Sequence, residues 1–443
     1  MRPRVIVIGL DGLEPAFAFD RFADVMPNLS AMRARGAWGP LRSTTPPITV
    51  PAWACMTSGT DPGRLGVYGF RNRRPGGYEM EMATARSIRV PRLWNLLSDA
   101  GKRVIVVGVP PTYPPAPVHG EMVSCLLTPP GRPFTHPASL QAEIEKQTGP
   151  WKSDVEEFRS GETARIVRDI EHMSDQRFAA AAHLARTRDW DFLMMVDMGG
   201  DRLHHALLGT PQWNEVGRRF YARLDAHLGA LCALADADTT VLVVSDHGAR
   251  EMEGVFRIND WLAREGLLVL ADRQTTSRAF HPGLVDWKRT TAWAEGGYYA
   301  RIFVNVRGEL PEGTIEPSDR ERVVAEIEAR LAEAPVANKA HRPESLYDDV
   351  QGAAPDLMVF FADLAVRAVG SVGGLDVVGR ENDTGPDGAN HSWHGVFAMT
   401  GPAVRPGRVD GAILQDVTPT VLGALGVDVP KGCLGIPRIG ATA

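Results

Sequence analysis

Residues 240–248, TVLVVSDHG, join a continuous apolar run to a polar end that contains Asp246 and His247. A short run that is apolar at every position indicates a strand buried on both faces, as in a parallel sheet. Asp246 and His247 would stand at the end of this strand, where Gly248 permits a tight curl that turns both side chains toward one ion. The alternative is an ordinary turn without a ligand.

Similar apolar runs recur along the chain, and stretches with helical spacing lie between them. This alternation predicts an α/β fold with a mostly parallel central sheet and helices on both faces. The expected buried parallel strands are Val5–Leu10, Val104–Val109, Asp191–Val196, Thr240–Ser245, Leu357–Phe361 and Gly395–Thr400. The expected helices are Pro27–Arg35, Arg92–Ala100, Thr163–Arg188, Trp213–Ala235, Ser318–Ala334 and Asp416–Leu425, together with a short helix from Pro51.

One long region departs from this alternation. We expect residues 1–250 and 376–443 to form a single α/β core and residues 251–375 to form an inserted cap, with approximate boundaries. The run at 356–361 is compatible with either part. Loops over a rigid scaffold often select the substrate. In the cap, Trp293, Tyr298 and Tyr299 flank a Gly-Gly pair, which suits either substrate contact or buried packing.

The net charge, the cysteines and the lengths of the apolar runs argue against several classes of protein. The net charge of −6 gives no general attraction to nucleic acid or anionic membranes. The 4 cysteines are far apart, which argues against a disulfide framework or a thiolate zinc site. No apolar run approaches the ~20 residues that span a bilayer. The first run ends at Leu10, too early for a signal peptide. We therefore expect a cytoplasmic protein with no membrane or nucleic acid partner; the sequence leaves the oligomeric state open.

Acidic and histidine residues follow the predicted strands. Asp11 follows the first strand, and Asp197 and Asp201 follow the run FLMMV. Ligands of open α/β sheets bind outside the carboxyl ends of the strands, so these groups should meet at one edge. Asp201 and His205 are four residues apart and share a helix face, whereas His204 would point elsewhere. A single Asp after a strand is usually a helix cap, but several such clusters with histidines indicate a metal site.

Two further segments carry candidate groups. In GANHSWHG, residues 388–395, either His391 or His394 could be a metal ligand, although an exposed loop histidine is the simpler explanation for each. In TTPPITVPAW, residues 44–53, Thr49 stands just before the helix expected from Pro51. A hydroxyl there meets the positive end of the helix dipole and free N–H groups, which suit a phosphoryl oxygen. A plain N-cap is the alternative.

Together these motifs resemble the alkaline phosphatase superfamily and, within it, the type I phosphodiesterase/nucleotide pyrophosphatase family. The similarity covers most of the chain. The matching motifs are GLDG at 9–12, the nucleophile region at 26–62, DRLHH at 201–205, SDHG at 245–248 and NHSWHG at 390–395. Smaller matches are INDWLAREGLL at 258–268, PDLMVFF at 355–361 and DVTPTVLGALGVDVP at 416–430.

The resemblance implies an alkaline phosphatase-like fold and a site with two divalent metal ions. One ion would be held by Asp11, Thr49, Asp246 and His247, and the other by Asp201, His205 and His391. Zinc suits these nitrogen and oxygen ligands, and manganese or iron remain alternatives.

The implied reaction is the hydrolysis of a small-molecule phosphodiester or nucleotide-like pyrophosphate. Thr49 would attack phosphorus, the first alcohol would leave, and water would then cleave the phospho-threonine. The metal ions would activate Thr49 and the water.

The chain departs from the family pattern after the nucleophile helix. Leu65 replaces a histidine of the family, and Gly69 or Phe70 lies near the position of an asparagine that binds a phosphate oxygen. Arg71 or Asn72 are possible replacements.

Other reactions of the superfamily therefore stay open: phosphomonoester, phosphonate or sulfate ester hydrolysis. Sulfatases need a Cys or Ser in place of Thr49. A relative that binds ligands without catalysis is the remaining alternative, although the full ligand set argues against it.

Overall fold

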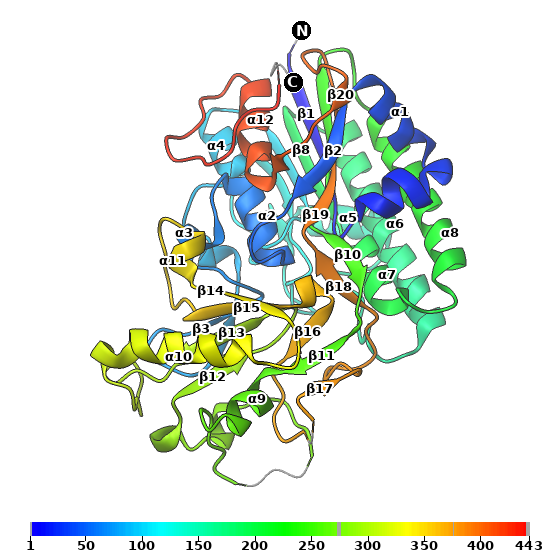
Figure 1. The fold of residues 1–443 in the computed structure, drawn as a ribbon. Helices are drawn as coiled ribbons and strands as arrows, with labels where there is room; N and C mark the ends of the chain where they lie inside the picture. Colours follow the sequence, from blue (N-terminus) through cyan, green and yellow to red (C-terminus); the bar gives the residue numbers. More distant parts are fainter. Residues whose placement is uncertain (1, 273–275, 375, 440–443) are drawn as a thin grey trace.

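The computed structural model describes residues 2–272, 276–374 and 376–439. A large sheet runs through the upper part of the molecule in Figure 1, with helices on both faces. At its centre, β1 (Arg4–Leu10) lies parallel to β8 (Phe192–Asp197) on one side and to β9 (Thr239–Val244) on the other. Strand β5 (Val104–Val107) continues the parallel order beyond β8. These strands are buried on both faces, which explains their continuous apolar sequences.

The remaining strands complete a 10-stranded sheet in the order β20-β2-β19-β9-β1-β8-β5-β6-β7, with β21 beside β2. Their bounds are β2 (Ala37–Arg42), β6 (Gly120–Val123), β7 (Thr135–His136), β19 (His394–Thr400), β20 (Gly407–Arg408) and β21 (Ala412–Ile413).

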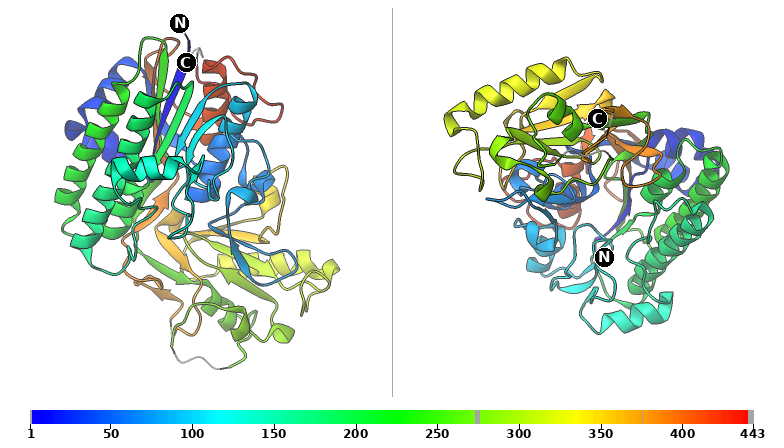
Figure 2. Two further views of the ribbon diagram at one scale, coloured as in Figure 1. Left: turned by 180° about the vertical axis from the view of Figure 1, so that it is seen from behind. Right: turned by 90° about the horizontal axis from the view of Figure 1, so that it is seen from below.

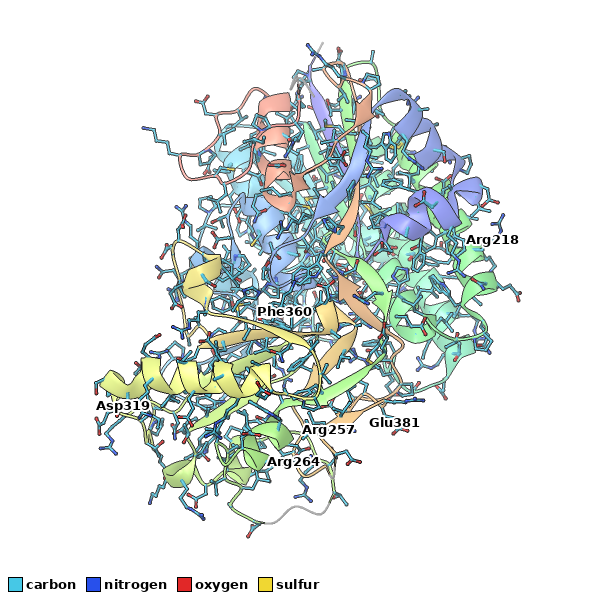
Figure 3. All side chains as sticks on the ribbon, viewed as in Figure 1. Arg218, Arg257, Arg264, Asp319, Phe360 and Glu381 are labelled. Carbon is cyan, nitrogen blue, oxygen red and sulfur yellow. The ribbon has the colours of Figure 1, made fainter. Side chains whose placement is uncertain are left out.

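Helices cover both faces of this sheet, and Figure 2 shows the two layers from behind and from below. On one face lie α1 (Pro27–Arg35), α5 (Leu140–Thr148), α6 (Thr163–Thr187), α7 (Gly199–Leu207) and α8 (Trp213–Cys232). On the other lie α2 (Thr49–Ser58), α4 (Leu93–Asp99) and α12 (Val417–Ala424). Apolar side chains from both layers and the sheet form one continuous core. Charged side chains such as Arg218 and Glu381 project from the outer surface (Figure 3).

A second, 7-stranded sheet lies below the first in Figure 1 and has an apolar cluster of its own. Its strands are β11 (Gly254–Arg257), β12 (Ala292–Glu295), β13 (Ala300–Val304), β14 (Asn338–His341), β15 (Leu357–Phe361), β16 (Val366–Val369) and β17 (Val378–Gly379). The helices α9 (Ile258–Arg264), α10 (Arg320–Ala332) and α11 (Pro343–Leu346) lie in the same part of the chain. The run at 356–361, which the sequence left between the two parts, thus belongs to the second sheet.

Smaller elements connect the two sheets. They are α3 (Pro62–Leu65), the pair β3 (Arg71–Arg73) and β4 (Met80–Met82), and the antiparallel pair β10 (Gly248–Glu251) and β18 (Ala389–Ser392). None of the described helices is long and apolar enough to cross a bilayer.

The predicted direction of two strands was wrong. Strand β19, expected to be parallel, runs antiparallel to both β9 and β2. Strand β15 is likewise antiparallel to its neighbours β13, β14 and β16. Both are buried on both faces, and a continuous apolar run reports that burial without reporting strand direction.

Candidate metal centre

The acidic and histidine residues that follow the strands meet at one edge of the central sheet. Asp11 follows β1, Asp246 and His247 follow β9, and Asp201 and His205 lie on α7 directly after β8. His391 arrives from the distant end of the sequence on β18, and Thr49 is the first residue of α2. Each of these side chains belongs to a residue that is at most 2% exposed.

One half of the cluster contains Asp11, Asp246, His247 and Thr49. His247 Nε2 lies 3.2 Å from Asp246 Oδ2 and 3.6 Å from Asp11 Oδ1. The Thr49 hydroxyl oxygen lies 3.3 Å from the same nitrogen. Oxygen atoms of Asp11, Asp246 and Thr49 therefore surround one nitrogen, Nε2 of His247, although the four residues come from three separate segments of the chain.

The other half contains Asp201, His205 and His391. Asp201 Oδ1 lies 3.3 Å from His205 Nε2 and 3.6 Å from His391 Nε2. These ligand atoms are all within 4.8 Å of one another, and so are those of Asp11, Asp201 and His247. Asp201 thus borders both halves, which the sequence assigned to separate ions.

Hydrogen bonds fix which imidazole nitrogen faces the cluster. Nδ1 of His247 lies 3.0 Å from the carbonyl of Gly248, and Nδ1 of His391 lies 2.7 Å from the carbonyl of Pro47. Because a carbonyl oxygen only accepts, both Nδ1 atoms carry the proton, and each Nε2 presents a lone pair to the cluster. This is the arrangement of metal-binding histidines, whose second nitrogen is held by an outer partner.

Several atoms that face this space have no hydrogen-bond partner among the described residues. They are Asp11 Oδ1, Asp246 Oδ2 and His391 Nε2, all fully buried. Leaving buried polar atoms unpaired is costly unless an ion or water satisfies them. Three carboxylates and three imidazoles are also the donor types that a divalent zinc ion takes. The residues therefore fit a metal site.

The charge states of Asp11, Asp246, His247 and His391 are consistent with a cation site. Burial, and then the negative charges of neighbouring carboxylates, raise the pKa of Asp11 and of Asp246 well above their usual range. Burial lowers the pKa of His247 to about 4 and that of His391 well below its usual value, so both are neutral near pH 7. Neutral imidazoles are the form that binds a metal, and a bound cation would offset the repulsion between the buried carboxylates.

Supporting residues surround the ligands, and the sequence analysis did not identify them. Asp387 Oδ1 accepts a hydrogen bond from Nδ1 of His205 at 2.7 Å, and Trp53 Nε1 donates to Asp11 Oδ2 at 2.6 Å. Glu14 Oε2 accepts from Ser392 Oγ at 2.6 Å and from the Ala249 N–H at 3.1 Å, and so ties β10 to β18. Asp387 lies four residues before His391, in the motif GPDGANH, which was the available signal.

Asp387 also anchors the charges behind His205. Its Oδ2 accepts from Arg367 at 2.5 Å and from Arg159 Nε at 2.8 Å. Burial opposes protonation of His205, but Asp387 and Asp201 outweigh it and raise the pKa of His205 to about 10. Asp387 therefore favours positive charge at the position of this imidazole.

Three nearby acidic or histidine residues lie outside the cluster: the alternative ligand His394, His204, which was expected to point elsewhere, and Asp197. His394 is exposed at the start of β19, opposite Arg42. His204 is buried among aromatic rings, with Nε2 2.9 Å from the Tyr221 hydroxyl. Asp197 accepts from Ser174 Oγ at 3.0 Å.

Asn72, a possible phosphate ligand, is engaged in a turn instead. Its Oδ1 accepts from the Tyr68 N–H at 2.7 Å, and its Nδ2 donates to the Gly69 carbonyl at 3.1 Å.

A cavity of about 360 Å³ is lined by Tyr298 and Arg202, which contact residues of the second half, and by none of the seven proposed ligands. Tyr298 lies between the cavity and the ligands, because it lines the cavity and its hydroxyl is 3.4 Å from His205 Nε2. The cavity is lined by arginines and aromatic rings, among them Arg71, Arg159, Arg202, Arg367, Phe70 and Phe158.

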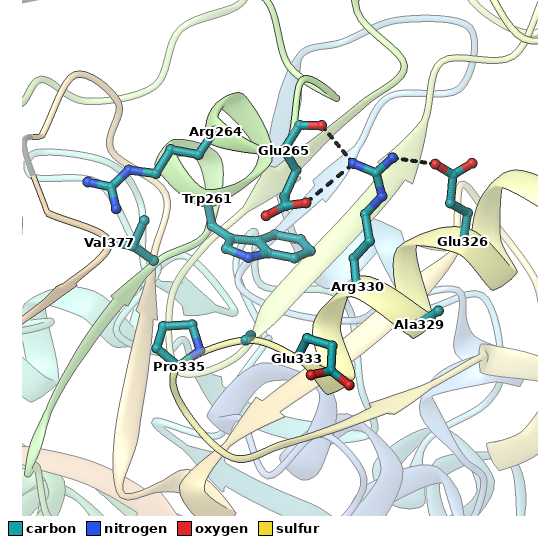
Figure 4. A pocket seen from close by; sticks show the side chains of 10 residues that line it. Trp261, Arg264, Glu265, Glu326, Ala329, Arg330, Glu333, Pro335 and Val377 are labelled. Carbon is teal, nitrogen blue, oxygen red and sulfur yellow. Dashed lines mark hydrogen bonds and ion pairs between the residues drawn. The ribbon is translucent and has the colours of Figure 1, made fainter.

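A second groove, of about 470 Å³, lies between α9 and α10 (Figure 4). There Arg330 donates to the Glu265 carbonyl at 2.7 Å and pairs with Glu326. None of its lining residues belongs to the metal-ligand cluster.

A solved structure of phosphonoacetate hydrolase from Sinorhizobium meliloti 1021, in complex with phosphonoformate, has a similar fold. The TM-score is 0.62 at 20% sequence identity, over 96% of each chain. No match was found among curated proteins.

The sequence model of the family described as "Type I phosphodiesterase / nucleotide pyrophosphatase" matches residues 5–395. This range includes every residue of the cluster and points to a hydrolase of phosphoric esters. The fold, with its mostly parallel sheet and the ligands at one edge, agrees with this match. The chain therefore belongs to the type I phosphodiesterase/nucleotide pyrophosphatase family, in the alkaline phosphatase superfamily.

Proposed function

We propose that this protein hydrolyses a small phosphodiester with two bound divalent metal ions and a phospho-threonine intermediate. The observation that carries the proposal is the convergence of seven buried groups from across the chain: Asp11, Thr49, Asp201, His205, Asp246, His247 and His391. A structural explanation would require partners for the buried atoms, and several have none among the described residues.

The residues divide between two ions. Asp11, Asp246, His247 and Thr49 would hold one, and Asp201, His205 and His391 the other. The mixed oxygen and nitrogen donors suit zinc, with manganese or iron as alternatives. When bound, such ions supply positive charge that activates a hydroxyl at neutral pH and stabilises the charge of the leaving oxygen.

Thr49 is the proposed nucleophile. It is the first residue of α2, and the N–H groups of a first helical turn have no partner within the helix. They suit the oxygens of a phosphoryl group placed beside the hydroxyl. The Thr49 oxygen forms a bond to phosphorus and the first alcohol leaves; water then attacks the same phosphorus and frees Thr49.

The second sheet is proposed to act as a cap that selects the substrate. It supplies Tyr298 and Arg367 to the cavity of about 360 Å³ beside the ligands. This volume lies at the small end of ligand sites, which favours a compact leaving group over a nucleotide. The arginines that line it favour an acidic substrate.

Phosphonate hydrolysis is the second candidate. The small, arginine-lined cavity would accept a short acidic phosphonate. The similar fold of phosphonoacetate hydrolase is consistent with this candidate, but likeness at 20% identity reports the fold alone.

One comparison tests these alternatives. Zinc-reconstituted protein would be assayed on a nitrophenyl phosphate diester, the matching monoester and phosphonoacetate, each with and without chelator. Faster, chelator-sensitive turnover of the diester supports the proposal. Preference for the monoester or for phosphonoacetate moves the protein to a phosphatase or a phosphonate hydrolase. The absence of any turnover favours a relative that binds ligands without catalysis.

A further inference from the structure

Tyr298 reaches from the second sheet to the metal-ligand cluster. It lies in the turn between β12 and β13, beside the pair Gly296 and Gly297. Its ring stacks on His391 with the ring centres 3.8 Å apart, and the Arg367 guanidinium lies 4.6 Å from the ring centre. Contacts with two rigid neighbours hold the phenol in a fixed direction.

The hydroxyl of Tyr298 has an unusual partner. Within the described part of the chain, its hydrogen bond goes to Nε2 of His205, at 3.4 Å. This nitrogen is the one proposed to bind an ion, because Nδ1 of the same ring bonds Asp387. An ion on Nε2 would replace the hydrogen bond and leave the hydroxyl beside the site without a protein partner.

The chain also lacks the side-chain donor that the family pattern places after the nucleophile helix. Gly69 and Phe70 offer none at that position. Asn72 is engaged with the backbone of Tyr68 and Gly69, and the side chain of Arg71 is 59% exposed, unlike the buried ligands. The Tyr298 hydroxyl, in contrast, lies next to the ligand His205, and Tyr298 lines the cavity.

We propose that the Tyr298 hydroxyl donates a hydrogen bond to a phosphoryl oxygen of the substrate. The bond strengthens as negative charge builds up on that oxygen during the reaction, so it acts mainly on the transition state. The inference rests on the proposed function, since it requires a phosphoryl group beside His205. It would give the second sheet a direct part in catalysis.

The test compares Tyr298→Phe with Tyr299→Phe, each loaded with zinc. The control removes a neighbouring hydroxyl that donates to the Tyr68 carbonyl at 2.6 Å instead of facing the ligands. Three quantities are measured: bound zinc, the calorimetric affinity for orthovanadate, and kcat and KM on the nitrophenyl diester. Vanadate affinity reports the contact even if no ester is turned over.

For Tyr298→Phe we expect unchanged zinc content, vanadate affinity and kcat each lower by about 100-fold, and KM within about threefold of wild type. Tyr299→Phe should match wild type in all three. Wild-type values for Tyr298→Phe would overturn the proposal, as would loss of zinc in parallel with affinity, because the hydroxyl would then support the ions instead. Selective loss of vanadate affinity without any ester turnover would support the contact while refuting the proposed reaction. Failure of the wild type to bind vanadate would overturn the contact.

Discussion

The hydroxyl oxygen of Thr49 lies 3.3 Å from Nε2 of His247, a nitrogen whose ring is already oriented by the Gly248 carbonyl. The proposed nucleophile and a proposed metal ligand therefore face the same buried space. The hydroxyl is held there by the start of α2 and not by a flexible loop.

Replacing Thr49 tests its role as the nucleophile. Thr49→Ala should lower kcat by about 10⁴-fold or more, because alanine has no hydroxyl to form the covalent bond to phosphorus. Thr49→Ser keeps a hydroxyl and should retain measurable turnover. Rapid-quench experiments should trap phosphate on the wild type and on Thr49→Ser. Unchanged hydrolysis by Thr49→Ala would refute the assignment.

The two histidines of the NHSWHG motif provide a matched pair. His391→Ala removes a buried Nε2 that faces Asp201 and should abolish zinc binding at one position, measured as zinc per chain. Activity should fall with it. His394→Ala removes an exposed side chain and should leave both quantities unchanged. The reverse result would show that the exposed histidine is the ligand.

Asp387 is expected to increase the affinity for zinc by orienting the imidazole of His205. Asp387→Asn weakens the bond that orients Nδ1, so zinc affinity, measured by competition with a chelator, should fall about 10- to 100-fold. Asp169→Asn, which disturbs a carboxylate paired with Lys152 and Arg165, should leave zinc affinity unchanged. If the two variants bound zinc with equal affinity, Asp387 would have no effect on the metal and would serve only as an ion-pair partner of Arg159 and Arg367.

The stability of the metal-free protein should fall as the pH rises through the alkaline range. The folded protein raises the pKa of His205 to about 10, whereas the unfolded chain has a value of about 6.5. Between these two pKa values the folded state binds a proton that the unfolded state has lost. The free energy of unfolding therefore falls as the pH rises. Thermal melting from about pH 7 to about pH 9 should show this decline.

Zinc should remove most of that decline, because a metal-bound His205 carries no proton on Nε2. The gap in Tm between zinc-loaded and chelator-treated protein should therefore widen with pH. The metal-free His205→Gln variant should show a smaller decline than the wild type. A gap that stays constant with pH would contradict the expectation.

Arg71 is expected to affect substrate binding more than chemistry. Its side chain is 59% exposed and lines the cavity, where it pairs with Glu295. Arg71→Ala should raise KM for an acidic substrate by about tenfold and change kcat little. This is expected for a residue that binds the substrate and the transition state equally well. The control is Arg74→Ala, which removes an equally exposed arginine that pairs with Glu81. Equal effects of the two changes would exclude a specific contact.

Much of the fold was predictable because burial leaves a clear pattern in the sequence. The helix Pro27–Arg35 was predicted to the residue, and the central strands to within one or two residues. The sequence did not predict that β19 runs antiparallel to its neighbour β9. Its apolar run indicates burial on both faces, and this burial is the same in parallel and antiparallel strands. The same limit applied to β15.

The part of the site that follows the central strands directly in sequence could be predicted. Asp11, Asp201 and Asp246 lie outside the carboxyl ends of their strands, where ligands of open α/β sheets bind. The supporting residues were not predictable, because Asp387 and Trp53 act through contacts that depend on tertiary packing. The cavity likewise depends on how the second sheet packs beside the first.

The position of His391 has a consequence for biosynthesis. The cluster draws on residues from Asp11 to His391, and the last arrives on a strand that pairs with β10. At a translation rate of about 5–20 residues per second, roughly 20 to 80 s separate the synthesis of the first and last ligands. A nascent chain therefore cannot assemble the full set of ligands until His391 on β18 has been made. Metal binding by Asp201, His205 and His391 together would then report that β18 has reached its place beside β10.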